Sequence, residues 1–169
     1  MTSYFILGGA RSGKSCRALA LAETIGTRRA FIATAEAWDE EMKIRIAHHK
    51  DERGPEWATL EAPLELVAAL NNVSQTAEVC LVDCLTLWLS NLMHHDRNVQ
   101  AETAKLCEAI SAFSIPIILV SNEVGLGIVP ETPLGRAFRD EQGRLNQAIA
   151  GVCDRVEFIA AGLSITLKG

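Results

Sequence analysis

The chain has 169 residues, 49% of them hydrophobic, which is enough for one continuous hydrophobic core and short for two ordinary domains. We therefore expect residues 1–169 to form a single domain. The formal net charge of -5 excludes a general basic field for nucleic acid or anionic lipid, so a polyanionic ligand needs a dedicated local site.

The N-terminal half alternates short apolar runs with stretches of helical spacing. In chain order, we expect a strand at 4–7, a helix at 14–23, a strand at 29–33, a helix from Asp39 through residue 49, an extended piece at 58–60, and a helix from Pro63 to residue 71. Asp39 is a residue type that caps helices. Pro63 suits a first helical turn, because the N–H that proline lacks has no intrahelical partner there.

The C-terminal half continues this alternation. We expect a strand at 78–82 that ends at Asp83, helices at 85–93 and 101–113, a strand at 115–121, a helix at 134–150, and strands at 156–160 and 164–167. Strands that alternate with helices require crossover connections, which favour an α/β fold with a mainly parallel sheet and helices on both faces. In such folds the ligand site lies at the carboxyl ends of the strands.

The segment after the first expected strand, Gly8-Gly9-Ala10-Arg11-Ser12-Gly13-Lys14-Ser15, matches the pattern GxxxxGK[ST], with the required strand before it and helix after it. Its glycines permit backbone angles that let N–H groups and the helix N-terminus surround phosphate oxygens. Lys14 would reach the β- and γ-phosphates, and Ser15 would bind Mg²⁺. The sequence therefore predicts a P-loop NTPase-like fold that binds a nucleoside triphosphate. The alternative is a glycine-rich turn that happens to precede a lysine.

Asp83 stands where an apolar strand ends, which is where P-loop enzymes carry a second acid that orients the metal or its water. An aspartate at this position can instead cap the following helix, and both interpretations remain open. Cys80 and Cys84 have no further metal ligands nearby in the sequence. We interpret both as small buried apolar residues and not as zinc ligands.

The cysteine count and the apolar stretches indicate in which cellular compartment the protein works. Five cysteines without a CxxC pair fit poorly with a disulfide framework. Each long apolar stretch is interrupted by a charge or a proline before it reaches membrane-spanning length, and the N-terminus lacks the pattern of a signal peptide. We therefore expect reduced thiols in a soluble, cytoplasmic protein that is not a membrane protein.

Two histidine pairs are candidates for chemistry. His48 and His49 lie in the expected helix 39–49, where adjacent side chains point in different directions, so at most one of them should act on a ligand. A neutral imidazole is a competent nitrogen nucleophile toward phosphorus. From spacing alone a solvated helix face is favoured, because no third residue is seen to orient either ring. His94 and His95 sit beside Asp96, Arg97 and Asn98, which look like a polar loop between helices, and they are assigned no role.

Several segments carry a more specific pattern. They are Gly8 to Ser15, Ile32-Ala33-Thr34, Asp39 to Met42 with Arg45 to Lys50, Thr86 to Leu92, Ser121 to Pro130, and Phe138-Arg139-Asp140 with Gly143 and Asn146. Together, and in this order, they resemble the bifunctional adenosylcobinamide kinase and adenosylcobinamide-phosphate guanylyltransferase family of cobalamin biosynthesis. The Asn-Glu-Val-Gly segment at 122–125 and the His-His pair are more distinctive than the phosphate loop.

The resemblance implies two reactions. ATP or GTP with Mg²⁺ phosphorylates adenosylcobinamide, and GMP from GTP then passes to adenosylcobinamide phosphate through a guanylyl-histidine intermediate, which gives adenosyl-GDP-cobinamide. The nucleophile falls on His48, which reverses the interpretation from spacing, and the family resemblance suggests a homotrimer. The implied catalytic residues are His48 and Lys14, and the implied metal-binding residues are Ser15 and Asp83. Nucleotide contacts fall on Gly8 to Ser15 and on Ala33, Thr34, Ala35, Lys50, Glu61 and Asp83.

Three other functions would share the same phosphate loop. A monofunctional small-molecule kinase would need no histidine nucleophile. A regulatory GTPase would normally carry an Asn-Lys-x-Asp segment, which this sequence lacks. A non-enzymatic nucleotide-binding module would bind GTP without consuming it. The fold alone does not distinguish among them.

Overall fold

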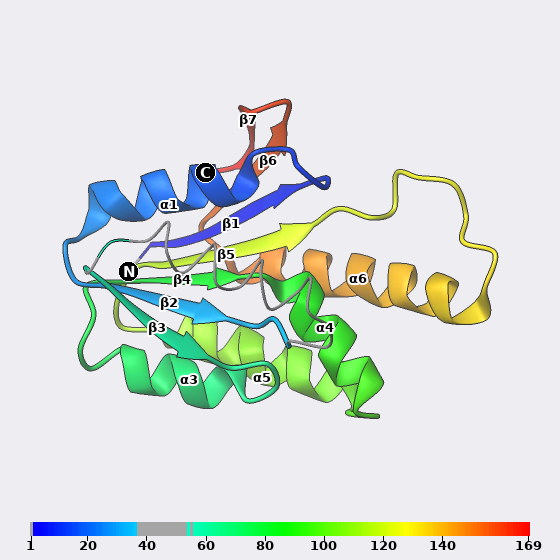
Figure 1. Cartoon of the computed structure of the whole chain (residues 1–169), viewed down its shortest axis with the longest axis horizontal. Coiled ribbons are helices and arrows are strands. Elements are labelled where there is room, and N and C mark those ends of the chain that lie inside the picture. The colour runs from blue at the N-terminus through cyan, green and yellow to red at the C-terminus, as the bar shows by residue number, and fades with distance from the viewer. Residues whose placement is uncertain (1, 37–53, 55) are drawn as a thin grey trace.

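Seven strands form one sheet in the computed structural model, which describes residues 2–36, 54 and 56–169 (Figure 1). The strand order is β3-β2-β4-β5-β1-β6-β7, and neighbouring strands are parallel except β6 and β7, which are antiparallel. The strands are β1 (Ser3–Gly8), β2 (Arg29–Ala33), β3 (Trp57–Glu61), β4 (Val79–Asp83), β5 (Ile117–Asn122), β6 (Arg155–Ala160) and β7 (Leu163–Lys168). The expected α/β architecture with a mainly parallel sheet is confirmed.

The described helices cover both faces of this sheet. They are α1 (Lys14–Ile25), α3 (Leu66–Val73), α4 (Leu85–His94), α5 (Val99–Ser111) and α6 (Pro133–Val152). Figure 1 shows α1 on one face and the other four on the opposite face. In the part of the chain that the structure describes, no helix is both long and apolar enough to cross a membrane.

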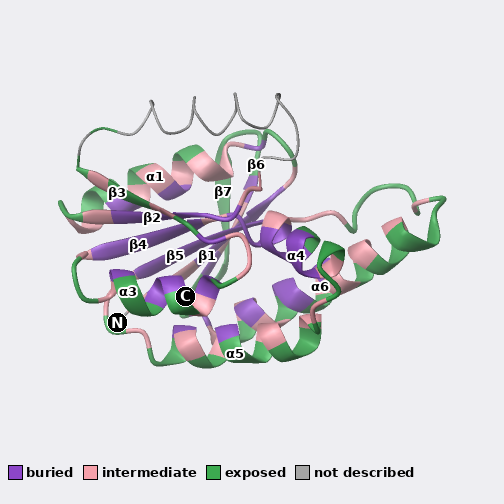
Figure 2. Cartoon of the chain, turned by 60° about the horizontal axis from the view of Figure 1, so that its bottom comes forward, coloured by how far each residue is buried: buried purple, intermediate pink, exposed green. Residues whose placement is uncertain are grey.

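The central strands are apolar at successive positions because both of their faces are buried. On β1, Phe5 and Leu7 pack in the cluster that contains α3 to α6, whereas Ile6 packs in the cluster that contains α1. On β4, Val82 packs in the cluster that contains α3 to α6, and Leu81 packs in the cluster that contains α1. Side chains alternate between the faces of a strand, so a sheet covered on both sides needs apolar residues at every position. Figure 2 shows this burial along β1, β2, β4 and β5.

The expected strands and helices in the described residues agree with the structure apart from their ends and one assignment. The expectation that Pro63 begins a helix is wrong, because the chain still follows β3 there and α3 begins at Leu66. Ala62 N–H donates to the carbonyl of Ala33 at 2.8 Å, which extends the pairing beyond β3. The expected helix at 85–93 extends by one residue, so His94 is the last residue of α4. The expected helix 39–49 lies outside the described residues.

An ion pair fixes α1 onto β6. Arg17 donates two hydrogen bonds to the carboxylate of Glu157, from Nε at 2.8 Å and from Nη2 at 2.7 Å. Such two-point pairing of a guanidinium with a carboxylate fixes direction as well as distance. The hydrogen bonds from Arg17 hold the pKa of Glu157 below its ordinary value, against the opposing effect of burial. The pair therefore orients the helix that follows the phosphate loop.

We expect Glu157→Gln to lower the free energy of unfolding at neutral pH by about 1 kcal/mol, because the amide cannot replace the charge-assisted pair. Since the folded-state pKa is lowered, the contribution is present above the unfolded-state pKa of about 4.3 and is lost as the pH falls through the folded-state value. Urea denaturation of both proteins at neutral pH and near pH ~3 measures the effect. The hypothesis fails if the difference between the two proteins is the same at both pH values.

Candidate nucleotide site

The carboxyl ends of the parallel strands bring separate parts of the sequence together. Glu61 on β3 and Asp83 on β4 are both register partners of Ala33 on β2, so the three residues lie in a row across the sheet. Asn122 at the end of β5 is likewise the register partner of Gly8 on β1, where the phosphate loop begins. Predicted site residues that are far apart in the sequence thus share one edge.

The phosphate loop joins β1 to α1, as expected. Gly13 adopts a left-handed conformation with φ of 99°, and Gly13 is also the N-cap of α1. It has no side chain to cap the helix, and the first turn carries no acidic residue, so the positive end of the helix faces the loop. The N–H of Gly162, in the β6–β7 turn, donates to the carbonyl of Ser12 at 2.8 Å and holds the loop from the other side. This arrangement suits an anion.

Lys14 lies across this loop. Its Nζ donates to the carbonyl of Gly9 at 3.0 Å, which places the ammonium group next to the loop backbone. Burial and, to a lesser degree, the charge of Asp83 raise the pKa of the Cys84 thiol to about 11, and the charge of Lys14 opposes this rise. Lys14 follows the loop at the end of β1 and Asp83 ends β4, so both lie at the carboxyl edge of the sheet.

Asp83 precedes α4 and does not act as its N-cap. The N-cap is Cys84, and that residue makes no side-chain capping hydrogen bond. Cys80 and Cys84 are buried and free, as expected for apolar residues. Burial also raises the pKa of Cys80 to about 12, so neither thiol is a reactive thiolate.

Thr34 has a role that the sequence did not reveal. Its side chain is fully buried, and its hydroxyl donates to the carbonyl of Cys84 at 2.6 Å and accepts from the N–H of the same residue at 2.9 Å. The hydroxyl therefore ties the end of β2 to the end of β4. The Thr34 hydroxyl is thus engaged within the protein, and Thr34 as a whole has no exposed surface. Ala35, the next predicted contact, is half-buried.

A buried polar network supports the end of β5 and was also not predicted. The N–H of Asn122 donates to Thr86 Oγ1 at 2.8 Å, and Asn146 Nδ2 donates to the carbonyl of Asn122 at 3.0 Å. Ser121 joins these two side chains, since its Oγ donates to Asn146 Oδ1 at 2.8 Å and lies 3.4 Å from Thr86 Oγ1. Gln142 Nε2 donates to both Ser121 and Asn146. The only sequence signal is that Thr86, Ser121, Asn122 and Asn146 fall within the segments of the family resemblance.

Two predicted residues, His48 and Lys50, lie outside the described residues. The other predicted positions all lie at the carboxyl edge of the sheet or in the phosphate loop. In the described ranges, no group of three or more His, Cys, Asp or Glu side chains could hold a metal ion.

Comparison with known proteins gives a family and a fold. A family model described as "Cobinamide kinase / cobinamide phosphate guanyltransferase" matches residues 4–167. The chain is 50% identical over 166 residues to the bifunctional adenosylcobalamin biosynthesis protein CobP of Pseudomonas aeruginosa, covering 97% of this chain and 96% of that protein. It is 35% identical to the bifunctional adenosylcobalamin biosynthesis protein CobU of Escherichia coli, covering 96% and 98% respectively.

Solved structures of more distant proteins share the fold. The flagellar accessory protein FlaH of Methanocaldococcus jannaschii has a TM-score of 0.53 at 16% identity. The match covers 99% of this chain and 78% of the FlaH chain. A KaiC-like protein of Pyrococcus horikoshii has a TM-score of 0.54 at 15% identity, with coverage of 93% and 71%. A third structure, of an ATPase domain, has a TM-score of 0.53 at 14% identity, with coverage of 93% and 68%. These similarities confirm the P-loop NTPase-like fold.

The first glycine of the loop should tolerate no side chain. A Cβ on Gly8 would lie 2.5 Å from Ser12 Oγ and 2.6 Å from the carbonyl oxygen of Ile159, whereas a Cβ on Gly9 would have nothing within 4 Å. We expect Gly8→Ala to lower the free energy of unfolding by about 1–3 kcal/mol and Gly9→Ala to change it by less than about 1 kcal/mol. Urea denaturation of the matched pair tests this. Equal effects would show that the close approach at Gly8 is not a constraint.

Proposed function

The chain belongs to the cobinamide kinase / cobinamide phosphate guanyltransferase family, and we propose that it phosphorylates adenosylcobinamide and then transfers GMP from GTP to the product. The observation that carries this proposal is the intact phosphate loop beside the row of strand ends, in a chain that matches the family over residues 4–167. Residues 1–169 would act as one catalytic domain.

In the kinase step, the terminal hydroxyl of the aminopropanol arm attacks the γ-phosphorus of ATP or GTP, and the nucleoside diphosphate leaves. Lys14 and the N–H groups at the start of α1 neutralise the charge that develops on the transferred group. Phosphoryl transfer through a loose transition state depends chiefly on such positioning and charge. The loop is held from β1, α1 and the β6–β7 turn, which supports this role.

The residues at the site fit Mg²⁺. Ser15 offers a hydroxyl in the first turn of α1, and Asp83 offers a carboxylate at the end of β4. Mg²⁺ commonly takes one or two protein oxygens and completes its shell with water and substrate phosphates, so a sparse protein site is sufficient. When bound, the ion would supply positive charge to the phosphates. Asp83 and Ser15 would hold it directly or through its waters.

In the second step, a histidine nitrogen of His48 attacks the α-phosphorus of GTP, and pyrophosphate leaves. The phosphate of adenosylcobinamide phosphate then attacks the guanylyl group, which releases His48 and forms adenosyl-GDP-cobinamide. Dividing the transfer into two displacements replaces one difficult step by two easier ones. Lys50 would stabilise charge on the phosphates, and Ala33, Thr34, Ala35 and Glu61 would contact the nucleotide.

The comparisons do not support the monofunctional kinase. Each of the two relatives carries a name that describes a bifunctional protein, and the family description gives both activities. The sequence also contains His48, the nucleophile that the family resemblance implies for the second activity. We therefore retain the two-step function.

We further propose a cytoplasmic homotrimer. The five free cysteines fit a reducing compartment. Leu126, Ile128 and Val129 are 82%, 97% and 57% exposed in a stretch that carries no charge from Val124 to Pro130. Contiguous exposed apolar surface of this kind marks association sites, and here we assign it to a second copy of the chain.

The covalent step is tested by incubating the protein with α-³²P-GTP and Mg²⁺, denaturing it, and measuring protein-bound label. We expect acid-labile, alkali-stable label in the wild type and in His49→Ala, and none in His48→Ala, because only His48 forms the phosphoramidate. His49→Ala is the matched control for loss of one imidazole in the pair. A wild type that retains no label would reject the guanylyl-histidine mechanism.

The assembly is tested by light scattering after gel filtration. The wild type should have a mass three times that of the 18.3 kDa chain. Ile128→Asp should shift the mass toward one chain, because it places a charge in the proposed interface. Ile165→Asp on β7, at a side chain that is 56% exposed, should leave the trimer intact. If only the β7 variant dissociates, the interface lies on β7 instead.

A further inference from the structure

A cavity lies between the second half of α4 and the first turns of α6. Its volume is about 590 Å³, within the range of roughly 300–1,000 Å³ that is typical of small-molecule sites. Three apolar side chains, Met93, Leu134 and Phe138, line it. The polar side chains that line it are those of Ser90, His94 and Thr132. Apolar walls with a few polar groups suit a large organic ligand.

Contacts at the end of β5 place this cavity beyond the carboxyl edge of the sheet. Thr86 in the first turn of α4 and Asn146 in α6 both bond backbone groups of Asn122. The two helices therefore meet the strand end side by side, and Figure 1 shows both continuing past it. At 1.5 Å per helical residue, Ser90 lies about 6 Å and Phe138 about 12 Å farther along their helices than these contacts.

The first turns of α6 project from the rest of the protein. Residues 133–140 are all exposed or half-buried, and Leu134 is 70% exposed. The buried residues of α6 lie farther along the helix, from Gln142 onward. The apolar side chains at the start of α6 thus face the cavity without a core beneath them.

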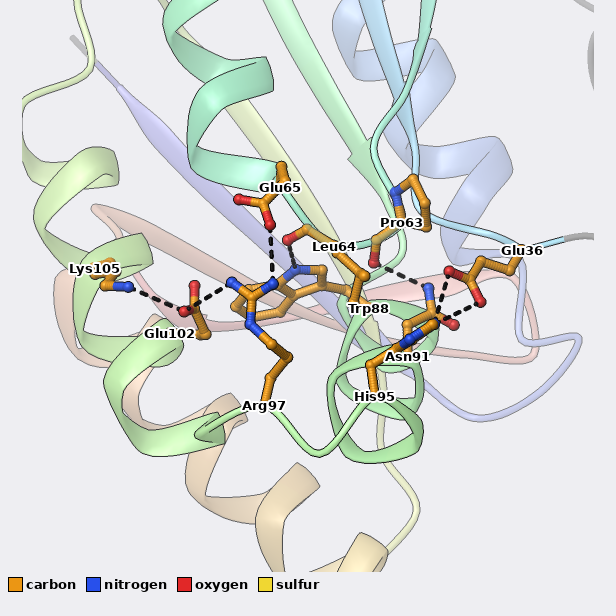
Figure 3. Close-up of polar contacts among 10 residues, drawn as sticks. All are labelled: Glu36, Pro63, Leu64, Glu65, Trp88, Asn91, His95, Arg97, Glu102 and Lys105. Atoms are coloured by element: carbon orange, nitrogen blue, oxygen red, sulfur yellow. Dashed lines mark hydrogen bonds and ion pairs between the residues drawn. The ribbon is translucent and has the colours of Figure 1, made fainter.

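The wall that α4 contributes is fixed from its other side (Figure 3). The indole Nε1 of Trp88 donates to the carbonyl of Leu64 at 3.0 Å. Asn91 Nδ2 donates to the carbonyls of Thr34 at 2.7 Å and Pro63 at 3.0 Å, which joins α4 to the exits of β2 and β3. At 3.6 residues per turn, the cavity-lining side chains of α4 point in other directions than these two. The wall is therefore in place without a ligand.

The cavity and the phosphate loop are neighbours along the same edge. Asn122, which both helices contact, is the register partner of Gly8, where the loop begins. The hydroxyl that accepts the phosphoryl group ends an arm of propionamide and aminopropanol, which spans roughly 9 Å when extended, by ordinary bond lengths. This length is comparable to the distance of the cavity from the strand ends, so a ring held in the cavity could present its arm to the loop.

We propose that this cavity holds the edge of the corrin ring of adenosylcobinamide, and this inference rests on the two-step function proposed above. The rim of a corrin ring carries methyl groups and amide side chains. Met93 and Phe138 would pack against the methyl groups, and Ser90 and His94 would bond the amides. Labelling of His48 by GTP needs no corrinoid, so changes in the cavity should spare it.

The test is equilibrium dialysis with adenosylcobinamide, whose visible absorbance reports binding. We expect Phe138→Ala, which removes an apolar wall, to raise the Kd about tenfold. Ser90→Trp, which fills the cavity from an exposed position, should raise it at least as much. Phe113→Ala is the matched control, because this phenylalanine is also half-buried but precedes β5 at the opposite edge of the sheet. It should leave the Kd unchanged.

Three further measurements separate the possible outcomes. Thermal unfolding shows whether each variant is folded, and Ser90→Trp decides if Phe138→Ala is not. The initial rate of labelling by α-³²P-GTP should stay within about twofold of the wild type in both cavity variants. The mass from light scattering should not change.

An unchanged Kd in Ser90→Trp would overturn the inference. An equal loss of labelling would also overturn it, because the cavity would then serve the nucleotide or the fold, and so would a change of mass, because the cavity would then be a contact between copies. A wild type that binds adenosylcobinamide but neither phosphorylates it nor takes up label gives a different result. It rejects the two-step function and leaves the binding site standing.

Discussion

The backbone groups at the ends of buried parallel strands must find hydrogen-bond partners outside the sheet, and this requirement shapes the whole site. The Thr34 hydroxyl forms hydrogen bonds with both the carbonyl and the N–H of Cys84. Asn91 serves the carbonyl of Thr34 in turn. At the end of β5, Thr86 and Asn146 serve the N–H and carbonyl of Asn122. Each of these side chains satisfies buried backbone and, in doing so, fixes the edge at which the expected nucleotide contacts lie.

The parts of the fold that could be predicted are those in which local sequence decides the outcome. Strands buried on both faces are continuous apolar runs, so β2 and β4 were recognised close to their true ends. The phosphate loop is a contiguous pattern, and parallel strands end at one edge, which is why Ala33 and Asp83 could be expected near each other. Pro63 was misassigned because its neighbours continue to pair beyond β3, and nothing local reveals this.

The contacts that support the site could not be predicted because their partners are distant in the sequence. Asn91 and Thr34 are 57 positions apart, and Thr34 and Cys84 are 50 apart. A buried threonine or asparagine shows in the sequence only as a polar residue near an apolar run, which fits a capping residue, a ligand contact or a backbone partner equally well. The family resemblance included Thr34, Asn91 and Asn146, but it did not separate contact with the nucleotide from support of the backbone.

Support of one site from several elements suits an enzyme that attacks one kind of nucleotide at two different phosphorus atoms. Attack at the γ-phosphorus and attack at the α-phosphorus require different atoms to be in line, so a single rigid arrangement cannot be ideal for both. Here the phosphate loop is fixed through Gly162 and the pair of Arg17 with Glu157, which secures the phosphates for either reaction. The exits of β2 and β3 are fixed through Asn91 on α4. Because the Thr34 hydroxyl also bonds the backbone of Cys84, these exits are tied to the end of β4, where Asp83 lies.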